Sequence, residues 1–155
     1  MATDSPEPAT LGEREQAAIA ALTRIRDPQS RFAWLIERAR ERPLLPDALR
    51  TDAHRVEGCL VRIWFVPEMQ DGRCVFQTDS DAVTLRALAG LWCDLASGAT
   101  PAELSRWQPD FFERLGLMRQ LAESRRATVL RIGDQIRAFA AANAARPDRE
   151  TAAAT

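Results

Sequence analysis

Apolar residues in the first third of the chain recur at intervals of three and four positions, the spacing that places side chains on one face of a helix. This spacing predicts a short helix over 13–26 and a second helix that begins after Asp27-Pro28, an N-cap followed by a first-turn proline. The second helix must stop before Pro43, and 43–46 is predicted to be a connector. The inward-facing positions of the two helices are Ile19, Leu22, Ile25, Phe32, Leu35, Ile36 and Ala39.

The pattern changes in the middle of the chain, where Val, Ile, Trp and Phe are enriched as in β-strands. We predict one strand within 55–69, or two strands broken at Gly58, and a returning strand at 74–78. The pair Asp71-Gly72 between them is typical of a tight hairpin turn. Both faces of 61–66 are largely apolar, so we expect this strand to be central in the sheet and covered on both sides.

Helical spacing returns in the second half of the chain, with start and stop signals at the ends of each stretch. The predicted helices are a long one from a cap at Ser80 or Asp81 to about Ala96, short ones at the capping box 100–103 and within 109–117, and a last long one capped by Ser124. The inward positions of the two long helices are Leu85, Leu88, Trp92, Leu95, Val129, Ile132, Ile136 and Phe139.

This order of elements predicts an α+β fold: a small antiparallel β-sheet, made of the hairpin plus a short third strand, flanked by several α-helices. A chain of 155 residues is long enough for one domain with its own core, which we place at 10–143. The flanking segments 1–9 and 144–155 are rich in small and polar residues and are predicted to be disordered.

The amino-acid composition limits the classes of partner that we expect this protein to bind. The 21 basic residues, all Arg, are balanced by 22 acidic ones, so there is no basic excess for a nucleic-acid partner. The N-terminus is acidic and no apolar run is long enough to span a bilayer, so we expect no signal peptide, no membrane association and a cytoplasmic location. In that compartment the cysteines are expected to be free thiols.

The three cysteines are an odd number without a C-x-x-C pair, and the single histidine, His54, has no partner at ligand spacing. We therefore expect no resident metal or cofactor. Cys74 lies within the returning strand and Cys93 within a strongly apolar helix, so both are interpreted as packing residues. No third residue is available to orient His54 toward Cys59, so His54 is interpreted as an exposed loop residue.

Cys59 allows two interpretations. Free cysteines are usually buried as small hydrophobic residues. However, Gly58 indicates a bend at which the next side chain can be presented outward, and Arg55 and Arg62 are near in sequence. A nearby cation favours the thiolate, which is the nucleophilic form.

Two polar clusters also have more than one interpretation. Helix capping explains Asp79-Ser80-Asp81 more simply than a metal or acid–base site does. Arg125-Arg126, at the start of the last helix, is unfavourable to the helix dipole. These arginines either face solvent or are held for a ligand or partner.

Taken together, these segments resemble the SufE family of sulfur-acceptor proteins, which serve cysteine desulfurases in iron–sulfur cluster assembly. The resemblance covers roughly residues 31–139, and several motifs agree in order and spacing. They are Phe32-Ala33-Trp34-Leu35-Ile36, Leu44-Leu45-Pro46, Arg55-Val56-Glu57-Gly58-Cys59, Ile63-Trp64, Asp79-Ser80-Asp81-Ala82, Arg86-Ala87-Leu88, Thr100-Pro101-Ala102-Glu103-Leu104, Phe112 to Leu117 and Leu121 to Arg125.

The resemblance implies that Cys59 is the catalytic, sulfur-accepting residue, on a loop at the edge of the sheet. It implies binding roles at the site for Gly58, Arg62, Arg125 and Asp79, with Asp81 as the alternative to Asp79. The implied function is to take persulfide sulfur from a cysteine desulfurase, stimulate that enzyme, and pass the sulfur to an iron–sulfur scaffold complex. Such a protein is a sulfur-transfer accessory rather than a stand-alone enzyme, and we expect a monomer or weak dimer that carries only a transient persulfide.

Three positions depart from the family pattern. Val61 stands where the family usually has serine, Thr128 where it usually has glycine, and Arg62 where an uncharged polar residue is common. They leave open an alternative function: a regulatory module that docks on a desulfurase or scaffold without carrying sulfur. For the carrier, we expect Arg62 or Arg125 near the sulfur, with a persulfide sheltered by the apolar residues Leu60, Val61 and Trp64.

Overall fold

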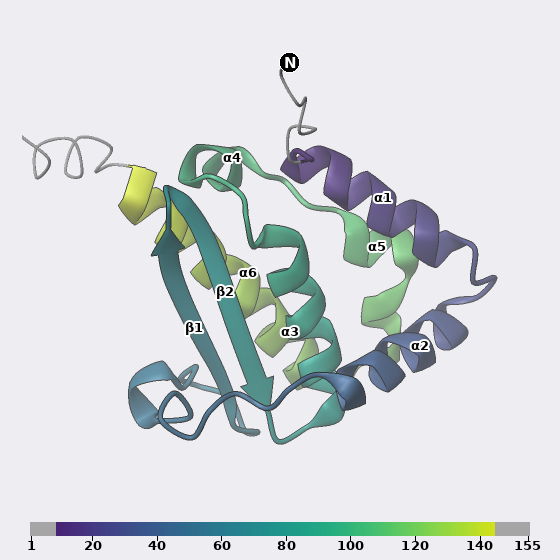
Figure 1. The fold of residues 1–155 in the computed structure, drawn as a ribbon. Coiled ribbons are helices and arrows are strands. Elements are labelled where there is room, and N and C mark those ends of the chain that lie inside the picture. Colours follow the sequence, from purple (N-terminus) through teal and green to yellow (C-terminus); the bar gives the residue numbers. More distant parts are fainter. Residues whose placement is uncertain (1–8, 145–155) are drawn as a thin grey trace, which may run out of the picture.

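A two-stranded antiparallel hairpin lies at the centre of the computed structural model, which describes residues 9–144 (Figure 1). Strands β1 (Ile63–Gln70) and β2 (Arg73–Ser80) pair in register from Ile63 opposite Ser80 to Gln70 opposite Arg73. The predicted turn at Asp71-Gly72 is confirmed, since both residues have positive φ, 51° and 77°, as this type of hairpin turn requires.

The helices follow the predicted order. They are α1 (Leu11–Thr23), α2 (Pro28–Glu41), α3 (Val83–Ala96), α4 (Pro101–Arg106), α5 (Phe111–Leu115) and α6 (Glu123–Ala144), with short 3-10 turns at Asp52–His54 and Leu117–Gln120. The expected caps at Asp27 and in the Thr100 capping box are confirmed. Two predicted caps are wrong. The residue before α3 is Ala82, and α6 already includes Ser124 because it begins at Glu123.

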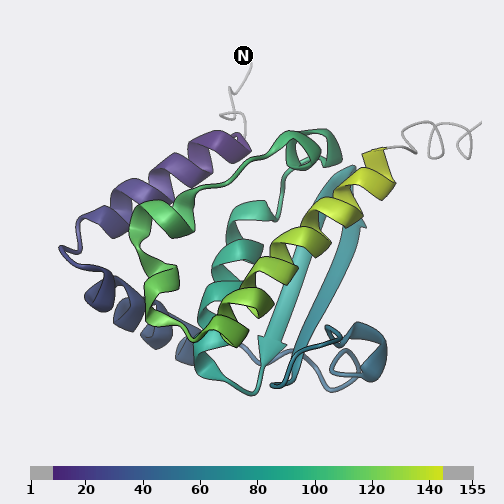
Figure 2. The same ribbon diagram turned by 180° about the vertical axis from the view of Figure 1, so that it is seen from behind.

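Helices α3 and α6 cover one face of the hairpin, while α1, α2 and α5 pack beyond α3 (Figures 1 and 2). The predicted apolar stripes of α3 and α6 form the centre of the core, where Leu88, Ile132 and Ile136 are fully buried. Burying such side chains is the main source of stability in a domain of this size. The stripe on α6 therefore determines which of its other residues face the strands and their loops.

The segment between α2 and β1 crosses the opposite face of the hairpin. Leu45 from this segment packs with Trp64 and Val66 of β1 in a second, smaller apolar cluster. Residues 63–66 are all buried, so the prediction that this strand is covered on both faces is confirmed.

The α+β class is confirmed. The sheet has two strands, so the prediction that the first strand is a central one is wrong. The expected third strand is represented by a single antiparallel bridge between Arg55 and Trp64, supported by a hydrogen bond of 2.9 Å from the Val56 N–H to the Ile63 carbonyl. Pairing ends there because the backbone turns at Gly58.

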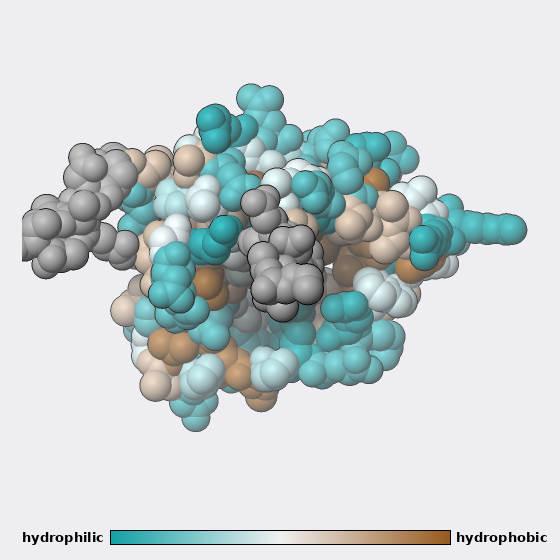
Figure 3. All heavy atoms as spheres, turned by 45° about the horizontal axis from the view of Figure 1, so that its top comes forward, coloured by the Kyte–Doolittle hydropathy of each residue, from teal (hydrophilic) through white to brown (hydrophobic). Residues whose placement is uncertain are grey.

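The surface seen from the N-terminal side is mainly hydrophilic, with apolar side chains in small scattered groups (Figure 3). Within residues 9–144, no helix combines the length and the apolar character needed to cross a bilayer. The predicted disordered segments 1–9 and 144–155 lie outside the described residues, except for Ala9 and Ala144.

Candidate functional site around Cys59

Cys59 lies on the loop that leads into β1, immediately after the bend at Gly58. Gly58 has φ of +79°, a left-handed conformation that costs other residues about 1–2 kcal/mol. The predicted bend at this glycine is thus present. The Cys59 side chain is half-buried and its thiol is free. The loop therefore combines an accessible sulfur with a backbone shape that glycine favours.

The polar side chains that contact this sulfur come from α6. The Thr128 hydroxyl lies 3.4 Å from Sγ and Nη1 of Arg131 lies 3.6 Å from it. These residues are three positions apart on the helix and so lie on the same face. Both groups can donate a hydrogen bond to the sulfur, and the guanidinium also carries a positive charge.

Gly58 also makes room for Arg131. A Cβ atom at Gly58 would lie 2.5 Å from Nη1 of Arg131, closer than real side chains allow. The same nitrogen donates a hydrogen bond of 3.0 Å to the Glu57 carbonyl. The guanidinium of Arg131 therefore lies directly against the backbone of the bend. Arg131 was not among the residues predicted from the sequence, although its spacing from Thr128, already noted as a departure, was the available signal.

Arg125 and Arg62 are engaged elsewhere. Nη1 of Arg125 donates a hydrogen bond of 2.6 Å to the Thr84 hydroxyl, which joins the beginnings of α6 and α3. Nε of Arg62 donates to Asp81 at 2.7 Å. The cation that the structure places against the sulfur is therefore Arg131, whereas Arg62 or Arg125 was expected from the sequence.

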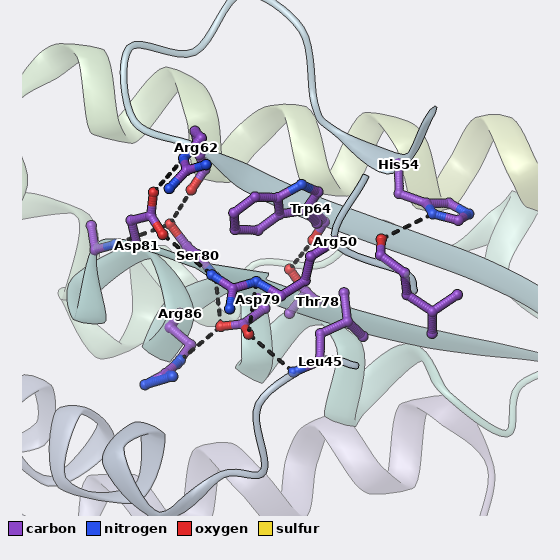
Figure 4. Close-up of polar contacts among 12 residues, drawn as sticks. Leu45, Arg50, His54, Arg62, Trp64, Thr78, Asp79, Ser80, Asp81 and Arg86 are labelled. Carbon is purple, nitrogen blue, oxygen red and sulfur yellow. Dashed lines mark hydrogen bonds and ion pairs between the residues drawn. The ribbon is translucent and has the colours of Figure 1, made fainter. Parts of the chain in front are cut away.

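Asp79 is a buried ion-pairing residue, and its interpretation as a helix cap is wrong. It is 1% exposed and accepts hydrogen bonds from Nε of Arg86 at 2.9 Å and from the Leu45 N–H at 3.0 Å (Figure 4). Burial alone would raise the pKa of Asp79. Hydrogen bonds from Arg86 and from the Leu45 and Ser80 N–H groups outweigh that effect, so the pKa lies below its ordinary value. Asp79 thereby fastens the segment after α2 to the hairpin.

Two arginines lie against Trp64 on the face of the hairpin opposite α3 and α6. The guanidinium groups of Arg50 and Arg62 lie 4.6 and 5.3 Å from the Trp64 ring centre, and both pair with Asp81 (Figure 4). Trp64 therefore belongs to a different apolar cluster from the one against which Cys59 packs.

The expected apolar shelter for the sulfur is only partly present. Leu60 is 91% exposed and Trp64 lies in the outer cluster, while Val61 is half-buried against the main core. Of the three residues expected to shelter the sulfur, only Val61 packs against the same core cluster as Cys59.

The other two cysteines are buried as expected, whereas His54, which was expected to be exposed, is half-buried. Cys74 and Cys93 are buried, and burial raises the pKa of both thiols, that of Cys74 to about 11. His54 is half-buried in its loop, with Nδ1 at 3.0 Å from the Leu49 carbonyl. The packing roles predicted for the two cysteines are confirmed, and Cys59 is the accessible thiol.

The fold and site define an α+β domain that presents one accessible cysteine on a glycine bend beside its last helix. The family model for SufE, the Fe-S metabolism associated domain, matches residues 16–140, and the chain belongs to this family.

Known proteins similar to this chain agree with that assignment. The SufE-like protein slr1419 of Synechocystis is 31% identical over 117 residues, which cover 76% of this chain and 74% of the relative. The sulfur acceptor protein CsdE of Escherichia coli is 32% identical over 99 residues, 63% of this chain and 67% of the relative. A solution structure of a hypothetical protein from Thermus thermophilus has the same fold, with a TM-score of 0.60 at 22% identity, covering 80% of this chain and 93% of that one.

Proposed function

We propose that this protein accepts sulfur on Cys59 from the persulfide of a cysteine desulfurase, stimulates that enzyme, and passes the sulfur to an iron–sulfur scaffold. The observation that carries the proposal is the accessible thiol of Cys59 beside Arg131, in a chain whose other two cysteines are buried. Membership of the SufE family supports it, as does the similarity to CsdE, which is named a sulfur acceptor. We expect the exchange to take place in the cytoplasm, where thiols are kept reduced.

The transfer is a thiol–disulfide type of exchange. The Cys59 thiolate attacks the terminal sulfur of the donor persulfide, and a new S–S bond forms on Sγ. The S–S bond of the donor breaks, and its electron pair leaves with the donor thiolate. No external oxidant is needed because the sulfur moves between two thiolates at the same oxidation level. A thiolate of the next acceptor removes the sulfur from Cys59 in the same way.

The test is to incubate the protein with a cysteine desulfurase and cysteine and to locate added sulfur by mass spectrometry. We expect one sulfur on Cys59 of the wild type, none on Cys59→Ser, and faster turnover of the desulfurase with the wild type alone. If both proteins stimulate the desulfurase and neither gains sulfur, the carrier function is refuted. The protein is then a docking module that regulates its partner.

A further inference from the structure

Two hydrogen-bond donors converge on the Cys59 sulfur from consecutive turns of one helix. They are the Thr128 hydroxyl, at 3.4 Å from Sγ, and Nη1 of Arg131, at 3.6 Å. Arg131 is held in this position by the loop itself, through its hydrogen bond of 3.0 Å to the Glu57 carbonyl. The donors are therefore positioned on the sulfur before any partner binds.

The guanidinium of Arg131 forms no ion pair with a carboxylate within residues 9–144. In the ion pairs formed within residues 9–144 the arginine partners are Arg40, Arg42, Arg50, Arg62, Arg86 and Arg137, and Arg131 is not among them. The nearest acidic residue along the helix, Asp134, pairs instead with Arg137 at 2.9 Å. Arg131 also borders an open cavity of about 720 Å³, so small reagents can reach it.

The Thr128 hydroxyl can respond to the state of the sulfur. It lies 3.1 Å from the Ser124 carbonyl and 3.4 Å from Sγ, and its single proton can be donated to one of them at a time. Beside a neutral thiol, the proton is best placed on the carbonyl. Beside an anionic sulfur, rotation of the hydroxyl gives a charge-assisted hydrogen bond, which is the stronger of the two.

We propose that Arg131 and Thr128 form a sulfur cradle, which binds the anionic terminal sulfur of a persulfide on Cys59. The cradle deepens the proposed carrier function and rests on it. An S–S bond is about 2 Å long, so rotation about the Cβ–Sγ bond can bring a sulfur added to Sγ within reach of both donors. The persulfide loses its S–H proton to solvent, and the cradle stabilises the resulting anion without any change of oxidation level. Arg131 thereby contacts the reacting atoms.

The charge of the cradle is tested with two alkylating reagents of nearly the same shape, anionic iodoacetate and neutral iodoacetamide. Arg131 attracts the anionic reagent to Cys59, so the ratio of the two rates measures its charge at the sulfur. We expect this ratio to fall about fivefold in Arg131→Gln, the factor for one unit charge at about 4 Å in water. Arg131→Lys is expected to keep most of the ratio. Arg126→Gln, at an exposed arginine of α6 that forms no ion pair within residues 9–144, is the matched control and should leave the ratio unchanged.

Retention of sulfur is tested without the desulfurase, by loading Cys59 with inorganic polysulfide. The thiolate takes the terminal sulfur, and a polysulfide one atom shorter leaves. We expect Arg131→Gln and Thr128→Val to lose the added sulfur to a mild thiol reductant several-fold faster than the wild type and the control Arg126→Gln do. Unchanged reagent ratios, or unchanged lifetimes of the persulfide, in Arg131→Gln would overturn the cradle. Failure of the desulfurase alone to load Cys59 would instead refute the proposed function, because polysulfide loading does not depend on it.

Discussion

Replacing Gly58 with alanine tests the two roles of this glycine, which forms the bend and leaves room for the side chain of Arg131. The loop requires φ of +79° at this position, and an alanine in that conformation costs about 1–2 kcal/mol because of its Cβ. The added Cβ also lies 2.5 Å from Nη1 and 3.2 Å from Cζ of Arg131. Because these atoms are the far end of a flexible side chain, Arg131 is expected to swing away at little further cost. The free energy of unfolding should thus fall by about 1–2 kcal/mol, nearly all of it from the backbone.

The matched control is Gly72→Ala in the hairpin turn. Gly72 has almost the same φ, +77°, but a Cβ there meets nothing within 4 Å. Urea unfolding should therefore show similar destabilisation in the two variants. The iodoacetate-to-iodoacetamide ratio at Cys59 should fall only in Gly58→Ala, because only there is Arg131 displaced. A double variant with Arg131→Gln should show no additional loss of the ratio, since the displaced charge is already absent.

The result that would refute this reasoning is a Gly58→Ala protein that keeps the wild-type reagent ratio. Such a protein would show that the guanidinium does not depend on the bare backbone of Gly58 for its position. Destabilisation of Gly58→Ala by much more than Gly72→Ala would contradict the premise that Arg131 moves away easily.

Two further predictions concern buried groups. Asp79→Asn should lower the free energy of unfolding at pH 7 by about 2–3 kcal/mol, because it removes charge-assisted hydrogen bonds. The folded-state pKa of Asp79 is depressed, so its stabilisation is fully present above the ordinary value of 3.8 and is lost as the pH falls through the folded value. Urea unfolding between pH 7 and acid should thus show a smaller acid loss in Asp79→Asn, and equal losses would contradict this account. Cys74 and Cys93 should react with iodoacetamide at neutral pH far more slowly than Cys59 does, until denaturant is added. Peptide mapping measures the three rates, and equal rates in the native protein would contradict the burial of Cys74 and Cys93.

The local pattern of apolar and polar residues in the sequence predicted much of the fold. The hairpin, its turn and the stripes of α3 and α6 follow from alternation and helical spacing, which act over a few residues. The short third strand was expected because the strand-like composition already begins at Arg55, before the break at Gly58. It is reduced to the Arg55–Trp64 bridge because the bend at Gly58 ends the pairing.

The site was predicted in part, and the missing part depends on tertiary packing. Cys59 and its bend are adjacent in sequence and could be identified together. Arg131 is 72 residues away from Cys59, and it meets the sulfur only because the buried stripe turns that face of α6 toward the loop. The partners of Arg62 and Arg125 likewise come from other elements, and no spacing along the chain indicates them.

The buried stripe of α6 has a consequence for the proposed delivery of sulfur. Val129, Ile132 and Ile136 on this helix are fully buried, so the helix cannot shift without opening the core. For the transfer proposed above, we expect any displacement of Cys59 toward another protein to come from the short loop between the Arg55 bridge and Ile63. This loop limits the reach of Cys59, so we expect a docking protein to bring its own cysteine close to the side of α6.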